Sequence, residues 1–127
     1  MLHIAPKHEP RRVVELEDGY HFMSERVLVV LGAGGMGEAI ARRLGAGRCV
    51  LLGDADERTL QRVSAALAAD GFKVIAQRVD ITARASVRAF AESAARAGVV
   101  EQVAHSAGLS PVQASTEAIL RVDLYGT

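Results

Sequence analysis

Short apolar runs alternate with helix-patterned segments along most of the chain, and this alternation restricts the fold more than any other feature. The first run, residues 27–31, is an unbroken aliphatic stretch that ends at a glycine. A run that is apolar on both sides is typical of a buried parallel strand. Further strands are expected at 49–52, 72–79 and 99–104, the last of which carries two polar residues near its centre.

The segments between these strands carry apolar residues at helical spacing. We expect helices at 35–45, 57–69 and 83–97, and a last helix near the end of the chain. Three of them follow a residue whose side chain can cap the first turn: Asp56, Thr82 and Ser115. Val87, Phe90, Ala91 and Ala94 are expected to face inward, and Leu60, Val63 and Leu67 share one face of their helix. Apolar residues at helical spacing also occur at Met36, Ile40 and Leu44. In the last helix they are Ile119, Leu120 and Leu124, which this chain is expected to leave underburied.

Strands that alternate with helices of this length predict a parallel sheet with right-handed crossovers. We therefore expect an α/β fold, a Rossmann-type parallel sheet with helices on both faces, truncated after about four strands. This domain would span residues 26–127. Residues 1–25 show no strand or helix period, so we expect a disordered or extended tail, with Met23 as an alternative natural start to Met1.

Composition argues against several classes of function. Lys and Arg number 15, as do Asp and Glu, and the resulting net charge of zero disfavours a nucleic-acid or membrane-surface partner. Cys49 is the only cysteine, which rules out an internal disulfide or a cysteine-rich zinc site and predicts a buried thiol. His3, His8 and His21 are spaced irregularly, so no metal site is expected. No membrane span or secretory leader is visible, and the expected location is cytoplasmic.

A glycine-rich turn joins the first strand to the first helix and is the strongest functional motif. Its residues are Gly32, Ala33, Gly34, Gly35, Met36 and Gly37, which contain the spacing Gly-x-Gly-x-x-Gly. Free N–H groups and the helix dipole at such a turn attract an anion. We expect Gly32 to make the tight turn, Gly34 to let a diphosphate approach, and Gly37 to let helix and strand pack closely.

An acidic residue at the end of the second strand supports a dinucleotide as the ligand. Asp54 follows Gly34 by 20 residues, and its carboxylate is expected to accept hydrogen bonds from the adenosine ribose. The same charge repels a 2′-phosphate, and Ala55 offers no cation to offset it, so NAD is favoured over NADP. Arg42 and Arg43 keep NADP as the alternative, although helical spacing turns both toward solvent.

Two further strand ends supply candidate binding residues. Asp80 ends the third strand and Ile81 follows it, and we expect both at the adenine, with capping of the next helix as the alternative role of Asp80. The fourth strand is followed by His105, Ser106, Ala107 and Gly108. The small residues there would let the backbone pass close to the cofactor. His105 is a candidate catalytic group, but a bond to nearby backbone is favoured, because no second titratable group is placed to pair with it.

Together these motifs resemble the short-chain dehydrogenases/reductases, in the same order and over residues 26–127. The resemblance implies hydride transfer between a nicotinamide cofactor and a carbonyl or alcohol. Three departures accompany it. The glycine spacing is one residue shorter than the family's Gly-x-x-x-Gly-x-Gly. The family's Asn-Asn-Ala-Gly loop reads His105-Ser106-Ala107-Gly108, and Asp123 takes the place of a helix Asn that supports a proton-relay water.

The catalytic residues that the resemblance implies are not found within these 127 residues. The family uses a Ser and a Tyr-x-x-x-Lys, in which the Tyr exchanges a proton and the Lys lowers its pKa. Neither Tyr20 nor Tyr125 is followed by Lys at that spacing. We therefore assign no catalytic residue and expect a cofactor-binding fragment that is inactive alone.

Two alternatives remain open. An apolar edge at the fourth strand would pair with another chain, which indicates a non-catalytic dinucleotide-binding or interaction module that self-associates. A methyltransferase that uses S-adenosylmethionine also combines a glycine turn with an acidic residue after the second strand. The Ser106–Gly108 loop fits a dinucleotide better.

Overall fold

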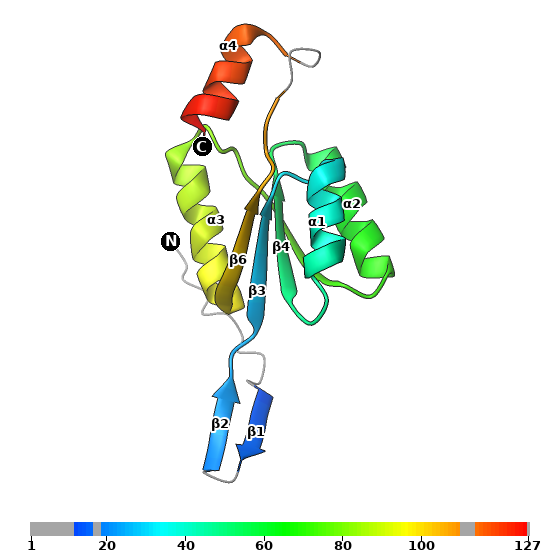
Figure 1. Ribbon diagram of the computed structural model, residues 1–127. Helices are drawn as coiled ribbons and strands as arrows, with labels where there is room; N and C mark the ends of the chain where they lie inside the picture. Colours follow the sequence, from blue (N-terminus) through cyan, green and yellow to red (C-terminus); the bar gives the residue numbers. More distant parts are fainter. Residues whose placement is uncertain (1–11, 17–18, 110–113, 127) are drawn as a thin grey trace.

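The computed structural model describes residues 12–16, 19–109 and 114–126, with side chains from residue 24 onward. Four strands form one parallel sheet in the order β5-β4-β3-β6 (Figure 1). They are β3 (Arg26–Leu31), β4 (Cys49–Asp54), β5 (Lys73–Arg78) and β6 (Val99–His105). The helices are α1 (Gly35–Leu44), α2 (Glu57–Ala69), α3 (Arg84–Ala97) and α4 (Thr116–Ile119), which continues as the π-helix η1 (Leu120–Tyr125). The predicted alternation of strands and helices is confirmed.

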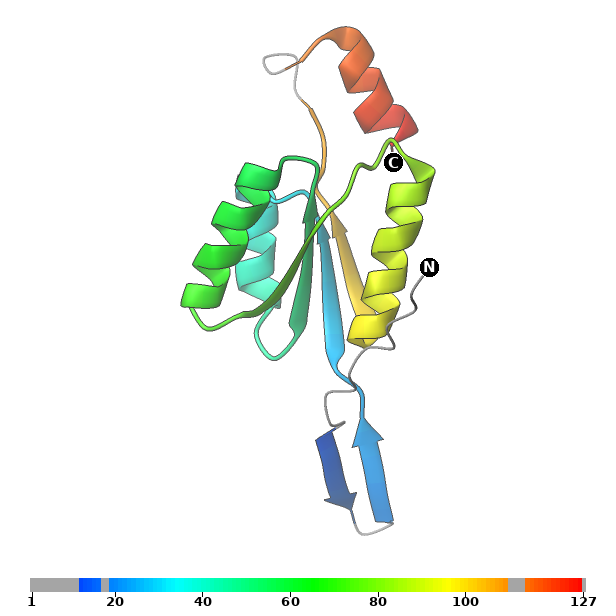
Figure 2. The same ribbon diagram turned by 180° about the vertical axis from the view of Figure 1, so that it is seen from behind.

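Helices cover both faces of this sheet, as expected for a Rossmann-type fold. Helices α1 and α2 pack on one face and α3 on the other, as the two opposite views show (Figures 1 and 2). The core on the α1/α2 face comprises Leu28, Val30, Ala33, Ala41, Val50, Leu52, Leu60, Val63 and Leu67. The core on the α3 face comprises Val27, Val29, Cys49, Leu51, Val79, Phe90 and Ala94. Side chains from β3 and β4 enter both cores, because successive residues of a strand point to opposite faces.

Helix α2 has the bounds and inward face that the sequence predicts. Asp56 caps it by accepting a hydrogen bond from the Arg58 N–H, and Leu60, Val63 and Leu67 are buried. The cap and the apolar spacing both depend on residues close together in the sequence, which is why they predict this helix correctly.

Helix α1 does not bury all of its helically spaced apolar residues. Met36 is 71% exposed, whereas the buried residues of this helix are Gly37 and Ala41. Ile40 and Leu44 pack against the core as partly buried residues. The helix approaches the sheet through small residues, and this close approach leaves Met36 outside the contact.

Helix α3 is buried along a narrower stripe than its sequence pattern predicts. Phe90 and Ala94 are buried, but Val87 is 37% exposed and Ala91 is exposed. The helix is preceded by Ala83 without a side-chain cap, so the expected cap by Thr82 is also wrong. The physical reason is that Thr82 donates its hydroxyl to Asp80 instead, at 2.6 Å.

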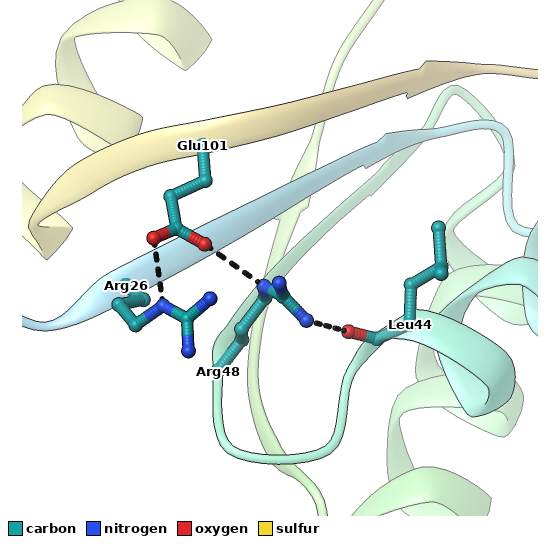
Figure 3. Close-up of polar contacts among 4 residues, drawn as sticks. All are labelled: Arg26, Leu44, Arg48 and Glu101. Atoms are coloured by element: carbon teal, nitrogen blue, oxygen red, sulfur yellow. Dashed lines mark hydrogen bonds and ion pairs between the residues drawn. The ribbon is translucent and has the colours of Figure 1, made fainter.

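Strand β6 forms an edge of the described sheet and contains a bulge. Val27 pairs with Val100 and Leu28 with Gln102, so Glu101 is the extra residue. The bulge places Glu101 where Arg26 Nε donates to Oε1 at 2.7 Å and Arg48 Nε donates to Oε2 at 3.1 Å (Figure 3). A bulge commonly re-aims a side chain in this way.

The C-terminal helix begins as predicted but buries little. Ser115 caps it by accepting a hydrogen bond from the Ala118 N–H. Leu120 is 48% and Leu124 is 60% exposed, in line with an apolar face that lacks sufficient cover in this chain. The helix lies beyond the carboxyl end of β6 (Figures 1 and 2).

The N-terminal segment contains a β-hairpin, although its residues show no clear strand period. Strands β1 (Arg12–Leu16) and β2 (Gly19–Met23) pair antiparallel, from Arg12 opposite Met23 to Leu16 opposite Gly19. An Asp-Gly pair between β-branched and aromatic residues is the sequence signal that would have indicated it. The expected tail therefore includes two paired strands, while its residues 1–11 lie outside the described part.

Cys49 is buried, as its apolar surroundings predict. Among residues 12–16, 19–109 and 114–126, no helix combines the length and the apolar character needed to cross a membrane. Those described residues also hold no group of three or more potential metal ligands. The cytoplasmic location stays a prediction.

Candidate functional site

The glycine-rich turn lies at the carboxyl end of β3, where two of its glycines are required by the fold itself. Gly32 has φ +100°, and a Cβ on it would lie 2.6 Å from the Ala107 backbone nitrogen. A Cβ on Gly37 would overlap the carbonyl oxygen of Gly32. These two glycines therefore make the turn and the close packing that the sequence predicts.

The two middle glycines of the turn have no such reason within the protein. A Cβ on Gly34 or Gly35 would meet no atom of the described residues within 4 Å. Helix α1 begins at Gly35, and its N-cap residue Gly34 provides no side-chain cap, so no described side chain accepts from its first backbone N–H groups. A helix start with uncapped N–H groups and no side chains above it fits a phosphate group.

Asp54 connects the end of β4 to this turn. Its Oδ2 accepts a hydrogen bond of 2.7 Å from the Ala33 N–H, and its Oδ1 accepts one of 2.8 Å from the Asp56 N–H. The side chain is half-buried beside the glycine turn. The carboxylate is therefore held in a fixed orientation, and its oxygens keep lone pairs for further donors.

The loop after β6 closes over the same turn through Ser106. The Ser106 hydroxyl lies within hydrogen-bond distance of two carbonyl oxygens, 3.2 Å from that of Leu31 and 3.1 Å from that of Gly32. Its backbone N–H donates to the Leu31 carbonyl at 2.7 Å. These bonds hold Ala107 against Gly32, where no room is left for a Cβ. His105, at the end of β6, is exposed.

Asp123 holds the far side of this loop. Its Oδ1 accepts a hydrogen bond of 2.8 Å from the Leu109 N–H, and a Cβ on Gly108 would lie 3.3 Å from the same oxygen. The carboxylate thus ties η1 to the loop that begins at Ser106.

Asp80 is engaged by the turn that follows β5. Its Oδ1 accepts hydrogen bonds from the Thr82 N–H at 2.9 Å and from the Thr82 hydroxyl at 2.6 Å. These bonds hold the pKa of Asp80 below its ordinary value. Ile81 lies beside the last turn of η1, because a Cβ on Gly126 would be 3.0 Å from its Cδ1.

The two arginines considered for a 2′-phosphate lie on the exposed side of α1. Arg42 Nη1 donates to Asp70 at 2.6 Å, and Arg42 Nη2 donates to Glu38 at 3.1 Å. Arg43 is exposed in the last turn of the helix. The Arg42 guanidinium is therefore already paired with Glu38 on α1 and with Asp70 directly after α2.

Sequence reasoning missed a different arginine at this end of the sheet. Arg78, the last residue of β5, pairs in register with Asp54 and donates its Nε–H to the Ala55 carbonyl at 3.2 Å. The two residues are 24 positions apart in the sequence, and only the alignment of the strands would have indicated that they meet.

Comparison with known proteins gives the following matches. The family model described as short chain dehydrogenase matches residues 25–122. The chain is 51% identical over 105 residues to the short-chain dehydrogenase/reductase bsc3 of Alternaria brassicicola. That alignment covers 83% of this chain but only 38% of the relative, so the chain spans well under half of the relative's length.

Two solved structures share the fold. A short chain dehydrogenase/reductase from Burkholderia phymatum in complex with NAD is 31% identical with a TM-score of 0.65, over 80% of this chain and 40% of that one. A metagenomic short-chain oxidoreductase in complex with NADP is 29% identical with a TM-score of 0.69, over 82% of this chain and 52% of that one. Both therefore extend well beyond the part that this chain matches.

Proposed function

Because the chain belongs to the short-chain dehydrogenase/reductase family, we propose that the carboxyl end of its sheet binds a nicotinamide dinucleotide. The observation that carries this proposal is the open space above Gly34 and Gly35, beside the fixed carboxylate of Asp54. Nothing in the described protein requires glycine at these two positions. A diphosphate lying on the first turn of α1 would require it.

Each predicted binding residue has a proposed part in this site. The N–H groups of Gly35, Met36 and Gly37 receive the diphosphate, and Asp54 accepts from the hydroxyls of the adenosine ribose. Asp80 and Ile81 lie at the adenine, where the carboxylate also orders the turn through Thr82. The backbone of Ser106, Ala107 and Gly108 passes beside the cofactor.

We place this chain in an oxidoreductase that acts on a carbonyl or alcohol. The bound nicotinamide would supply or take up the hydride. The 127 residues hold and orient the cofactor but offer no Tyr-x-x-x-Lys to move the proton, so we propose that they do not turn over substrate by themselves. Carbonyl-dependent NADH oxidation by the purified chain, lost in a Gly37→Val variant, would contradict this inactivity.

Asp54 makes NAD the favoured cofactor, with NADP as the alternative. A carboxylate beside the ribose binds its hydroxyls and repels a 2′-phosphate. The solved relatives described above were obtained with NAD in one case and NADP in the other.

A second candidate function is self-association. Val99 and Val103 on β6 are 54% and 62% exposed, and Leu120 on η1 is 48% exposed. Exposed apolar residues on an edge strand favour pairing with another strand. The chain is expected to sediment as a dimer or larger at micromolar concentration, and a Val103→Lys variant as a monomer. A wild-type monomer that does not bind the dye ANS would refute this role.

The dinucleotide site is tested by Gly34→Ala. Because a Cβ there meets no described atom, the free energy of unfolding should change by less than about 1 kcal/mol. The affinity for NADH, measured by calorimetry, should fall by about tenfold or more. Arg62→Gln on the exposed face of α2 is the control and should keep both values.

Wild-type binding of NADH that is equal in the Gly34→Ala variant would place the ligand elsewhere. Failure of the wild type to bind NADH would refute the proposal. Tighter binding of S-adenosylhomocysteine than of NADH would indicate a methyltransferase instead.

A further inference from the structure

Arg78 lies next to Asp54 in the sheet, although the two residues are far apart in the sequence. The two residues are register partners at the carboxyl ends of β5 and β4, so their side chains leave the same face of the sheet. That face carries α1 and α2, since Val74 and Val50, which precede them at even spacing, both pack in the α1/α2 core. The glycine turn, Asp54 and Arg78 therefore lie side by side at the carboxyl ends of β3, β4 and β5.

The guanidinium of Arg78 is held at the carboxyl end of the sheet by one hydrogen bond, which leaves other N–H donors unused. Its Nε–H donates to the Ala55 carbonyl at 3.2 Å, and its two Nη atoms have no acceptor among the residues that the structure describes. Its charge also reaches Asp80, whose pKa is lowered first by the Thr82 hydrogen bonds and further by Arg78. Arg42 is by contrast bound to Asp70 and Glu38.

We infer that Arg78 is a specificity-determining residue that offsets the charge of Asp54 against the 2′-phosphate of NADP(H). A guanidinium with unused Nη donors matches the geometry of a phosphate. Asp54 by itself would exclude the phosphorylated cofactor, and Arg78 reduces that exclusion. The site accordingly prefers NAD(H) by a small factor instead of rejecting NADP(H). This inference rests on the proposed function, because it concerns the adenosine end of the same dinucleotide.

The test compares NADH and NADPH affinities by calorimetry in the wild type, Arg78→Gln, Arg78→Lys and the control Arg62→Gln. Arg78→Gln should lower the affinity for NADPH by about tenfold and the affinity for NADH by less than about twofold, because only the 2′-phosphate loses a charged partner. Arg78→Lys should retain most of the NADPH affinity. A higher salt concentration should lower the affinity for NADPH more in the wild type than in Arg78→Gln. The control should match the wild type.

Equal losses for both cofactors in Arg78→Gln would overturn the inference, since Arg78 would then act on the shared part of the ligand. Unchanged NADPH affinity would overturn it as well. In either case NADH still binds the wild type and the proposed function stands. Failure of the wild type to bind either dinucleotide would refute the proposed function itself, and this inference with it.

Discussion

The backbone N–H of Ala33 donates a hydrogen bond of 2.7 Å to Oδ2 of Asp54, 21 residues further along the chain. This bond fixes the glycine turn to the end of the neighbouring strand. The other carboxylate oxygen accepts from Asp56, the cap of α2. One side chain thus fixes both the glycine turn before α1 and the residue that caps α2.

Asp54→Asn should lower both stability and affinity. The amide offers one oxygen where two N–H donors need acceptors, so we expect a loss of about 1–3 kcal/mol in the free energy of unfolding. NADH affinity should fall by about tenfold, because a charged acceptor for the ribose is lost. Urea denaturation and calorimetry measure the two effects. A variant as stable as the wild type would contradict the anchoring role of Asp54.

Gly37→Ala and Gly35→Ala should have opposite effects on stability, although they lie two residues apart. A Cβ at Gly37 overlaps the Gly32 carbonyl, so the backbone must shift, at a cost above about 2 kcal/mol. A Cβ at Gly35 meets nothing described within 4 Å, and alanine in a helix should add about 0.4–1 kcal/mol. Urea midpoints of the two variants decide this. Equal destabilisation would show that the space above Gly35 is not open.

Asp123→Asn should be tolerated and Asp123→Ala should not. Asn keeps an oxygen that accepts from the Leu109 N–H, whereas Ala removes the acceptor. We expect a loss of about 1 kcal/mol in the Ala variant and little change in the Asn variant. Amide exchange at Leu109 should accelerate only in the Ala variant. If both variants exchange alike, the hydrogen bond does not hold the loop.

Glu101→Gln should lower stability at pH 7 but not in acid. Arg26, and then Arg48, hold the pKa of Glu101 below its ordinary value of about 4.5. Because the pKa is lower in the folded state, this stabilisation is complete above pH 4.5 and is lost as the pH falls through the lower folded value. The gap in urea midpoint between wild type and variant should therefore be small at pH 7 and should narrow progressively as the pH falls below 4.5.

The matched control is Glu92→Gln on the exposed face of α3, which removes the same charge elsewhere. A gap for Glu101→Gln that stays constant from pH 7 to pH 3 would exclude an electrostatic origin.

Local signals account for what could be predicted. The Asp56 cap and the spacing of Leu60, Val63 and Leu67 gave α2 its bounds, because both act within a few residues. The glycine turn was recognised for the same reason. Exposure was predicted less well: Val87 and Ala91 fit the period of α3 but lie outside its narrow contact with the sheet.

The order of strands and helices, the tight turn at Gly32 and the acidic end of the second strand follow from the amino-acid sequence alone. These depend on backbone conformation and on side chains close to one another in the chain. Which distant residues meet depends on the packed sheet. Strand alignment brought Arg78 beside Ala55, and a bulge turned Glu101 toward two arginines. Such contacts depend on strand order and register, which are set by how the whole sheet packs.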